Sequence, residues 1–200
     1  MELTEMRDSK PVIRYFVAYA HEDRKLKDKL LKCLKERLAI AKEYHFDPWD
    51  DGEILAGERW HEQIQVAVAH CQFGLLLVSP AFLGSTYIKD HELPAFVTSN
   101  LTTPEPEKRA IPVALKRILF DDSIDLKGLK HLQVFHDRAG KSFQNCRDER
   151  TRDDFAWELF LQILKIVKRY VMSSPRETRL ATPLAELTTC STFRGQVSEC

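Results

Sequence analysis

Side chains that could carry out chemistry are concentrated in three segments of the sequence. These segments are residues 16–23 (FVAYAHED), 46–60 (FDPWDDGEILAGERW) and 75–96 (LLLVSPAFLGSTYIKDHELPAF). They supply an imidazole, several carboxylates and several hydroxyl groups, which can bind sugar and phosphate oxygens or stabilise a developing positive charge. By residue type alone, a carboxylate such as Glu92, which follows the charged run KDH, is more typical of a solvated helix face.

Several other chemistries are disfavoured by the motifs that the sequence lacks. It contains no G-x-G-x-x-G, no G-x-x-x-x-G-K-[ST] and no G-x-S-x-G, which argues against a Rossmann dehydrogenase, a P-loop NTPase and a Ser-His-Asp hydrolase. Its five cysteines are widely spaced, with no CxxC and no Cys/His cluster. This pattern predicts reduced thiols and no metal site.

The composition is that of an ordinary soluble protein. The chain has 200 residues, 44% of them hydrophobic, and its 30 Lys and Arg balance its 30 Asp and Glu. A neutral chain does not favour a nucleic-acid partner. The unbroken apolar runs, such as residues 73–78, are far shorter than the ~20 residues that span a bilayer. Because the N-terminus also lacks an apolar signal segment, we expect a cytoplasmic protein with no nucleic acid and no membrane as partner.

Strand-like and helix-like patterns alternate along the chain and must position the three segments. Runs of β-branched and aromatic residues predict strands, and apolar residues at spacings of three and four predict amphipathic helices. We expect strands at residues 12–20, 44–49, 73–79, 110–115 and 132–135. We expect helices beginning near residues 23 and 60 and covering 81–98, with a bend at Pro94, and 153–171. The spacing of Trp60 from Ile64 and Val68 favours a place in the core over stacking on a cofactor.

This alternation predicts an α/β, flavodoxin-like fold with a five-stranded parallel sheet and helices on both faces. In such a sheet a ligand binds beyond the carboxyl ends of the strands, so the loops after Ala20, Trp49 and Ser79 should converge. We expect an N-terminal extension at residues 1–11, the domain at 12–172, and a flexible tail or linker at 173–200, where Ser, Thr and Pro accumulate.

The three segments, in their order and spacing, resemble the sequence boxes of a Toll/interleukin receptor (TIR) domain of the bacterial kind. FVAYAHED is similar to a strand ending in F-x-S-Y-S-H-x-D, DDGEILAG to an aspartate-rich loop that closes on glycine, and SPAFLGS followed by ELP to the third box. The resemblance covers about residues 12–171. It implies the same fold that the periodicity predicts.

The resemblance also implies an activity. Many bacterial TIR domains hydrolyse NAD+ or convert it to cyclic ADP-ribose products, and the glutamate they use maps to Glu92. Cleavage of the nicotinamide–ribose bond builds positive charge on the ribose, which a nearby carboxylate can stabilise, and nicotinamide leaves without an acid. The implied function is an NAD+ glycohydrolase in bacterial antiphage or cell-suicide defence, with NAD+ as substrate, no cofactor, and a sensor protein or domain as activator.

Substrate-binding positions are implied in each segment. They are Tyr19, Ala20 and His21 in the first, Trp49, Asp50 and Gly57 in the second, and Ser85, Tyr87 and Ile88 in the third. In the family the second loop closes over substrate and meets a neighbouring subunit, which implies self-association. Two positions depart from the family pattern: a common serine is Ala18, and the usual aromatic four residues before the glutamate is Ile88. The adjacent Tyr87 could supply the missing ring.

Alternative interpretations apply to several of these residues and to the function. His21 binds a phosphate or ribose oxygen, or it belongs to the turn that starts the next helix, with Asp23 as N-cap. Ser79 and Ser85 are ribose contacts or helix caps. The alternative function is a non-catalytic TIR module that assembles with other TIR domains as a signalling adaptor, and turnover of NAD+ discriminates between the two.

Overall fold

The computed structural model describes residues 10–50, 52, 59–97, 108–119 and 123–171. Within these ranges strands and helices alternate as β1 (Val12–Ala18), α1 (Arg24–Ala39), β2 (His45–Trp49), α2 (Trp60–His70), β3 (Phe73–Val78), α3 (Pro80–Gly84), β4 (Arg109–Ala114) and α4 (Glu149–Ile166). The strand order is β2-β1-β3-β4, and neighbouring strands are parallel. The predicted α/β fold with a parallel sheet is confirmed.

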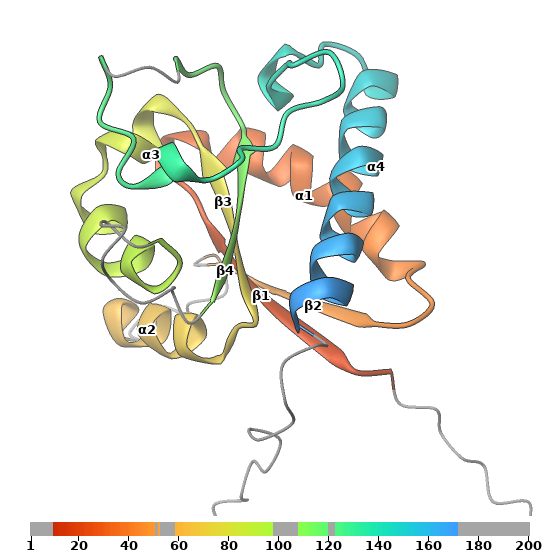
Figure 1. The fold of residues 1–200 in the computed structure, drawn as a ribbon, viewed down its shortest axis with the longest axis horizontal. Helices are drawn as coiled ribbons and strands as arrows, with labels where there is room; N and C mark the ends of the chain where they lie inside the picture. Colours follow the sequence, from red (N-terminus) through yellow and green to blue (C-terminus); the bar gives the residue numbers. More distant parts are fainter. Residues whose placement is uncertain (1–9, 51, 53–58, 98–107, 120–122, 172–200) are drawn as a thin grey trace, which may run out of the picture.

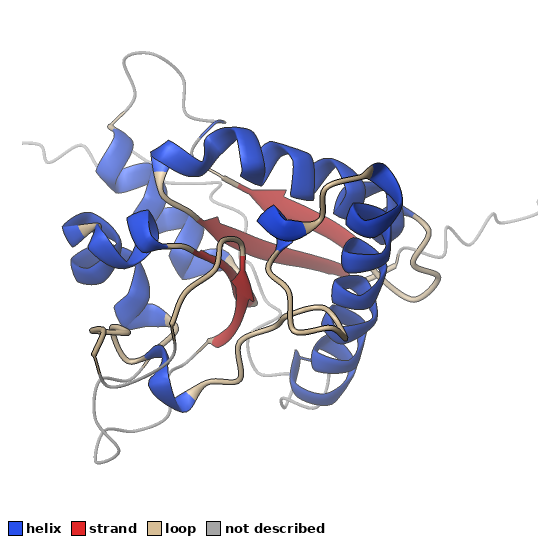
Figure 2. Ribbon diagram, turned by 90° about the horizontal axis from the view of Figure 1, so that it is seen from above, coloured by secondary structure: helices blue, strands red, loops and turns tan. Residues whose placement is uncertain are grey.

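Helices cover both faces of the sheet. Helices α1 and α4 pack against each other on one face, whereas α2 and α3 lie on the other (Figures 1 and 2). Successive side chains of a strand point to opposite faces, so β1 sends Tyr15 and Val17 into one core and Phe16 and Ala18 into the other. Burial on both faces explains why β3 reads as the continuous apolar run FGLLLV.

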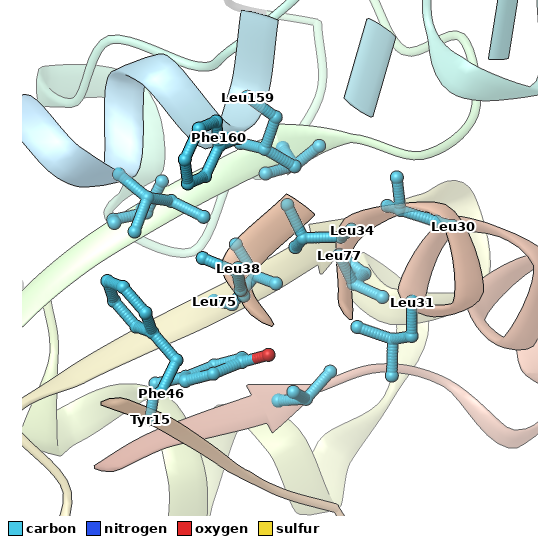
Figure 3. Packing of buried hydrophobic residues seen from close by; sticks show 14 of the residues in the cluster. Tyr15, Leu30, Leu31, Leu34, Leu38, Phe46, Leu75, Leu77, Leu159 and Phe160 are labelled. Atoms are coloured by element: carbon cyan, nitrogen blue, oxygen red, sulfur yellow. The ribbon is translucent and has the colours of Figure 1, made fainter. Parts of the chain in front are cut away.

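The core between the sheet and the α1–α4 pair is built from leucines and aromatic rings (Figure 3). Leu30, Leu34 and Leu38 of α1 recur every four residues, so they share one helix face and pack above Tyr15 and its neighbours. Each fully buried leucine contributes about 1.5–3 kcal/mol to stability. The leucine spacing that predicts the helix therefore also places the side chains that pack α1 against the sheet.

The two ends of the described chain lie together at the edge of the sheet where the strands begin (Figure 1). Lys10 Nζ donates to the carbonyl oxygen of Ala41, just after α1, at 3.0 Å. Ala41 in turn shares a shallow surface pocket with Lys168, near the C-terminal end of the last helix. The expected tail at residues 173–200 lies outside the described residues, as do residues 1–9 of the expected extension.

The predicted fifth strand at residues 132–135 is wrong for the part of the chain that the structure describes, where the sheet has four strands. A single parallel bridge joins Val113 to Phe135, made by Phe135 N–H donating to Pro112 O (2.8 Å) and Ala114 N–H donating to Phe135 O (2.9 Å). Pro112 has no N–H to offer the outer edge of β4, so the ladder cannot extend past this bridge.

The predicted helix at residues 81–98 is a series of short turns instead. Helix α3 ends at residue 84, a π-helical turn covers Ile88–Glu92, and a 3₁₀ turn covers Leu93–Ala95. The Ser85 hydroxyl caps the start of the next turn by accepting a hydrogen bond from the N–H of residue 88 at 3.3 Å. Pro94 has no N–H with which to continue the helix.

The last helix begins earlier than the apolar pattern predicts. Asp148 is its N-cap and accepts a hydrogen bond from Thr151 N–H at 2.8 Å. This hydrogen bond holds the pKa of the Asp148 carboxyl below its usual value. The helix therefore starts at Glu149 rather than near Asp153, because the capping residue precedes the first apolar position by several residues.

Gly74, in β3, leaves room for the ring of Phe96. A Cβ at this position would lie 2.8 Å from two atoms of the Phe96 ring, which is buried and stacks on Phe16 with a centroid distance of 6.0 Å. Because the ring is enclosed by core side chains, we expect Gly74→Ala to lower the free energy of unfolding by about 1–3 kcal/mol. Chemical denaturation measures this difference.

The matched control for this substitution is Gly84→Ala. A Cβ there meets no other atom within 4 Å, so the free energy of unfolding should change by less than about 0.5 kcal/mol. An equally small change for Gly74→Ala would show that the Phe96 ring moves aside without cost.

Candidate active site

A cavity of about 500 Å³ opens at the carboxyl ends of β1 and β3, on the face of the sheet that carries α2 and α3. Three stretches line it: residues 16–22 at the end of β1, the first turns of α2, and residues 81–92. The parallel-sheet rule places ligands at this edge. The loops after Ala20 and Ser79 converge here, as the sequence predicts.

Glu92 forms part of the cavity wall and is 6% exposed. It is the last residue of the π-helical turn, in which Leu93 N–H donates to Ile88 O across five residues. The turn buries Ile88 and Glu92 and leaves the three residues between them exposed. The structure thus places Glu92 in the wall of the cavity rather than on a solvated face.

The charge of Glu92 acts on the neighbouring ring of Tyr87. Burial raises the pKa of the Tyr87 hydroxyl, and the negative charge of Glu92 raises it further. The hydroxyl therefore keeps its proton at neutral pH and is available as a hydrogen-bond donor. His61 Nδ1 lies 3.0 Å from the Tyr87 oxygen.

Aromatic rings from α2 and from residues 87–91 meet at the cavity. The ring centroids of Trp60 and Tyr87 are 4.3 Å apart, and those of His61 and His91 are 4.7 Å apart. Trp60 is 39% exposed and lines the cavity. The expectation that Trp60 belongs to the core is therefore wrong, because the first turn of α2, residues 60–63, is exposed and burial begins only at Ile64.

The predicted positions of the first and third segments lie together. Tyr19, Ala20 and His21 line the cavity from one side, and Ser85, Tyr87 and Ile88 line it with Glu92. The ring of Tyr19 is held from behind by the buried Lys27, whose Nζ lies 4.5 Å from the ring centroid. Seven of the predicted site residues thus share one cavity, which their separation in the sequence does not show.

Two of the three predicted positions of the second segment, Trp49 and Asp50, do not line the cavity. Trp49 stacks on Phe16 with ring centroids 5.3 Å apart, and it does not line the cavity. Asp50 forms an ion pair with Lys27 at 3.3 Å and accepts a hydrogen bond from Gly52 N–H at 2.9 Å. Gly57 lies outside the described residues. Trp49 and Asp50 therefore support the start of the second loop instead of contacting a ligand in this cavity.

A family model for the TIR domain matches residues 16–149, from within β1 to the first residue of α4. The protein belongs to the TIR domain family. The match includes all three stretches that line the cavity. A comparison with curated proteins found no match. TIR domains include enzymes that cleave NAD+ and non-catalytic signalling adaptors, and they typically self-associate.

Below its cavity this TIR domain contains a buried polar network that sequence reasoning missed. Asp23, 1% exposed, accepts a hydrogen bond from the Ser79 hydroxyl and forms an ion pair with Lys116. The Ser79 oxygen also accepts Phe82 N–H at 3.0 Å as the cap of α3. The network joins the segments that follow β1, β3 and β4, so Asp23 makes no side-chain cap for α1 and Ser79 is not exposed to a ligand.

No helix in the described ranges is both long and apolar enough to cross a membrane. Among the residues with described positions, no three His, Cys, Asp or Glu side chains are grouped as metal ligands. The residues that line the cavity carry a carboxylate, aromatic rings and hydroxyl groups.

Proposed function

We propose that this TIR domain is an NAD+ glycohydrolase and that Glu92 is its catalytic residue. The observation that carries the proposal is the position of Glu92 in the wall of the cavity at the carboxyl edge of the sheet, nearly removed from solvent. Membership of the TIR domain family supports a function in signalling or in NAD+ cleavage in general.

The proposed reaction breaks the bond between the nicotinamide nitrogen and C1′ of the ribose. The electron pair leaves with nicotinamide, which becomes neutral, and the ribose becomes an oxocarbenium-like cation. The Glu92 carboxylate stabilises this cation, and it does so more strongly in a water-poor cavity than it would in solvent. Water then adds to C1′ and gives ADP-ribose, whereas attack by a nitrogen of the adenine gives a cyclic product.

Other residues of the cavity help to bind the substrate. His21 and Ser85 supply polar groups for the ribose or the pyrophosphate. NAD+ is the substrate, and no separate cofactor takes part. Self-association of TIR domains, or an activating sensor partner, completes the site in the setting of bacterial defence that we propose.

The test is to incubate the purified protein with NAD+ at several protein concentrations and to separate the products by chromatography. We expect nicotinamide and ADP-ribose, or a cyclic variant, to appear as NAD+ disappears, with a specific activity that rises with protein concentration because assembly completes the site. Absence of nicotinamide at the highest concentration, with the oligomer formed, would contradict the proposal. A specific activity independent of concentration would show that one chain holds the complete cavity.

A second candidate function is a non-catalytic adaptor. The observation that favours it is Ile88, an aliphatic residue in the cavity wall where the family usually has an aromatic ring. An adaptor would self-associate in sedimentation experiments without consuming NAD+. The same incubation therefore separates the two functions.

A further inference from the structure

Trp60 has an exposure and a position that core packing does not explain. It is the first residue of α2, its side chain lines the cavity, and it remains 39% exposed. The other two tryptophans have different surroundings: Trp49 stacks on Phe16, and Trp157 lies on α4, beside Phe160 and away from the cavity. Trp60 is therefore the tryptophan that presents an indole ring to a ligand in this cavity.

The second ring of the pair, Tyr87, is held in place by α2. Its centroid lies 4.3 Å from that of Trp60, with an angle of 36° between the ring planes. His61 Nδ1 contacts its hydroxyl at 3.0 Å, and the ring of His91 packs against it at 4.7 Å. Gln65 Nε2 fixes the same segment by donating to His91 O at 3.1 Å. The two rings thus form a positioned pair rather than two independent side chains.

Residue 88 cannot provide an aromatic surface. Ile88 is 4% exposed and belongs to the apolar cluster beneath the cavity, with Ile64 and Leu93. Its aliphatic side chain closes the floor of the cavity but has no π-face. Phe16 and Tyr19 also line the cavity, but they are only 2% and 6% exposed. The more exposed Trp60–Tyr87 pair is therefore the better aromatic partner for a planar ring bound here.

We propose that Trp60 and Tyr87 bind the planar, positively charged nicotinamide ring of NAD+, with Trp60 as the principal contact; this rests on the proposed function. The face of an indole attracts a cation more strongly than the faces of other aromatic side chains, and the interaction strengthens when solvent is excluded. The Glu92 carboxylate in the same cavity adds to the attraction for a cationic ring. Binding of the ring at this pair directs C1′ of the ribose toward Glu92.

The first experiment compares Trp60→Leu with Trp60→Phe in NAD+ cleavage. Leucine keeps an apolar side chain without a π-face, so we expect KM for NAD+ to rise about tenfold, whereas phenylalanine keeps a ring and should restore most of the affinity. Trp157→Leu, on α4, is the matched control and should leave KM unchanged. Equal effects of leucine and phenylalanine, or no effect of leucine, would overturn the proposal.

The second experiment measures binding without turnover and uses the 1-methylnicotinamide cation as the probe. We expect saturable quenching of tryptophan fluorescence in the wild type and in Trp157→Phe, and its loss in Trp60→Phe. Circular dichroism checks that the variants are folded. If the wild type cleaves no NAD+ but shows this quenching, the proposed function fails and the aromatic contact stands. Quenching that persists in Trp60→Phe, or that never saturates, overturns the contact itself.

Discussion

Replacing Glu92 with glutamine is expected to lower kcat/KM for NAD+ at least about a hundredfold while leaving the domain folded. Glutamine keeps the size of the side chain and removes only the negative charge that would stabilise the ribose cation. Loss of one well-placed electrostatic group in an active site typically costs a factor of this order or more. Because the charge is needed in the transition state, the loss should fall mainly on kcat.

The matched control is Asp90→Asn, in the same π-helical turn. Asp90 is exposed, whereas Glu92 lines the cavity, so the control removes a neighbouring charge without changing the cavity wall. We expect its kcat/KM to stay within about twofold of the wild type. Similar losses in both variants would mean that the total negative charge of the turn, and not the Glu92 carboxylate in particular, supports the reaction. Full activity of Glu92→Gln would place the catalytic group elsewhere.

Replacing Asp23 with alanine is expected to lower the free energy of unfolding by about 2–3 kcal/mol. The Ser79 hydroxyl, which has no exposed surface, would lose its acceptor, and Lys116 would lose its ion-pair partner. Lys116 is 30% exposed and regains some hydration, so the expected loss is at the lower end of what breaking a buried ion pair costs. Urea denaturation measures the difference.

One further variant separates the hydrogen bond of this network from its ion pair, and a second serves as a control. Asp23→Asn keeps an acceptor for Ser79 but removes the charge beside Lys116, so its loss should be smaller than that of alanine. Asp154→Ala, an exposed acid on α4, is the control and should change the free energy of unfolding by less than about 0.5 kcal/mol. If Asp23→Ala costs no more than this control, the network does not stabilise the fold.

The fold was predictable where one periodicity dominates a segment. The leucines of α1 and the apolar run of β3 each have a single pattern, and both elements form as expected. The fifth strand was not predictable from its own residues, because the missing donor is Pro112 in the neighbouring strand. The helix expected after Pro80 fails for a local reason: the cap at Ser85 and the proline at position 94 divide it.

The candidate site was predictable to the extent that parallel strands bring their carboxyl ends together. Glu92 lines the same cavity as His21, but it was indicated by the resemblance to TIR domains. The strand-end rule by itself suffices for His21, which follows β1. It does not suffice for Asp50, which turns toward Lys27, because the direction of a loop side chain depends on its ion-pair partner. The contact between Asp23 and Ser79 joins the segments that follow β1 and β3, and it leaves no periodic signal in either segment.

The placement of both described ends at the edge where the strands begin bears on how the protein can be handled. The cavity lies at the opposite edge, where β1 and β3 finish. Residues 10 and 171, the two described ends, therefore lie away from the cavity. The protein could be immobilised on a sensor surface, or fused to a reporter, with the route for a small solute into the cavity still open.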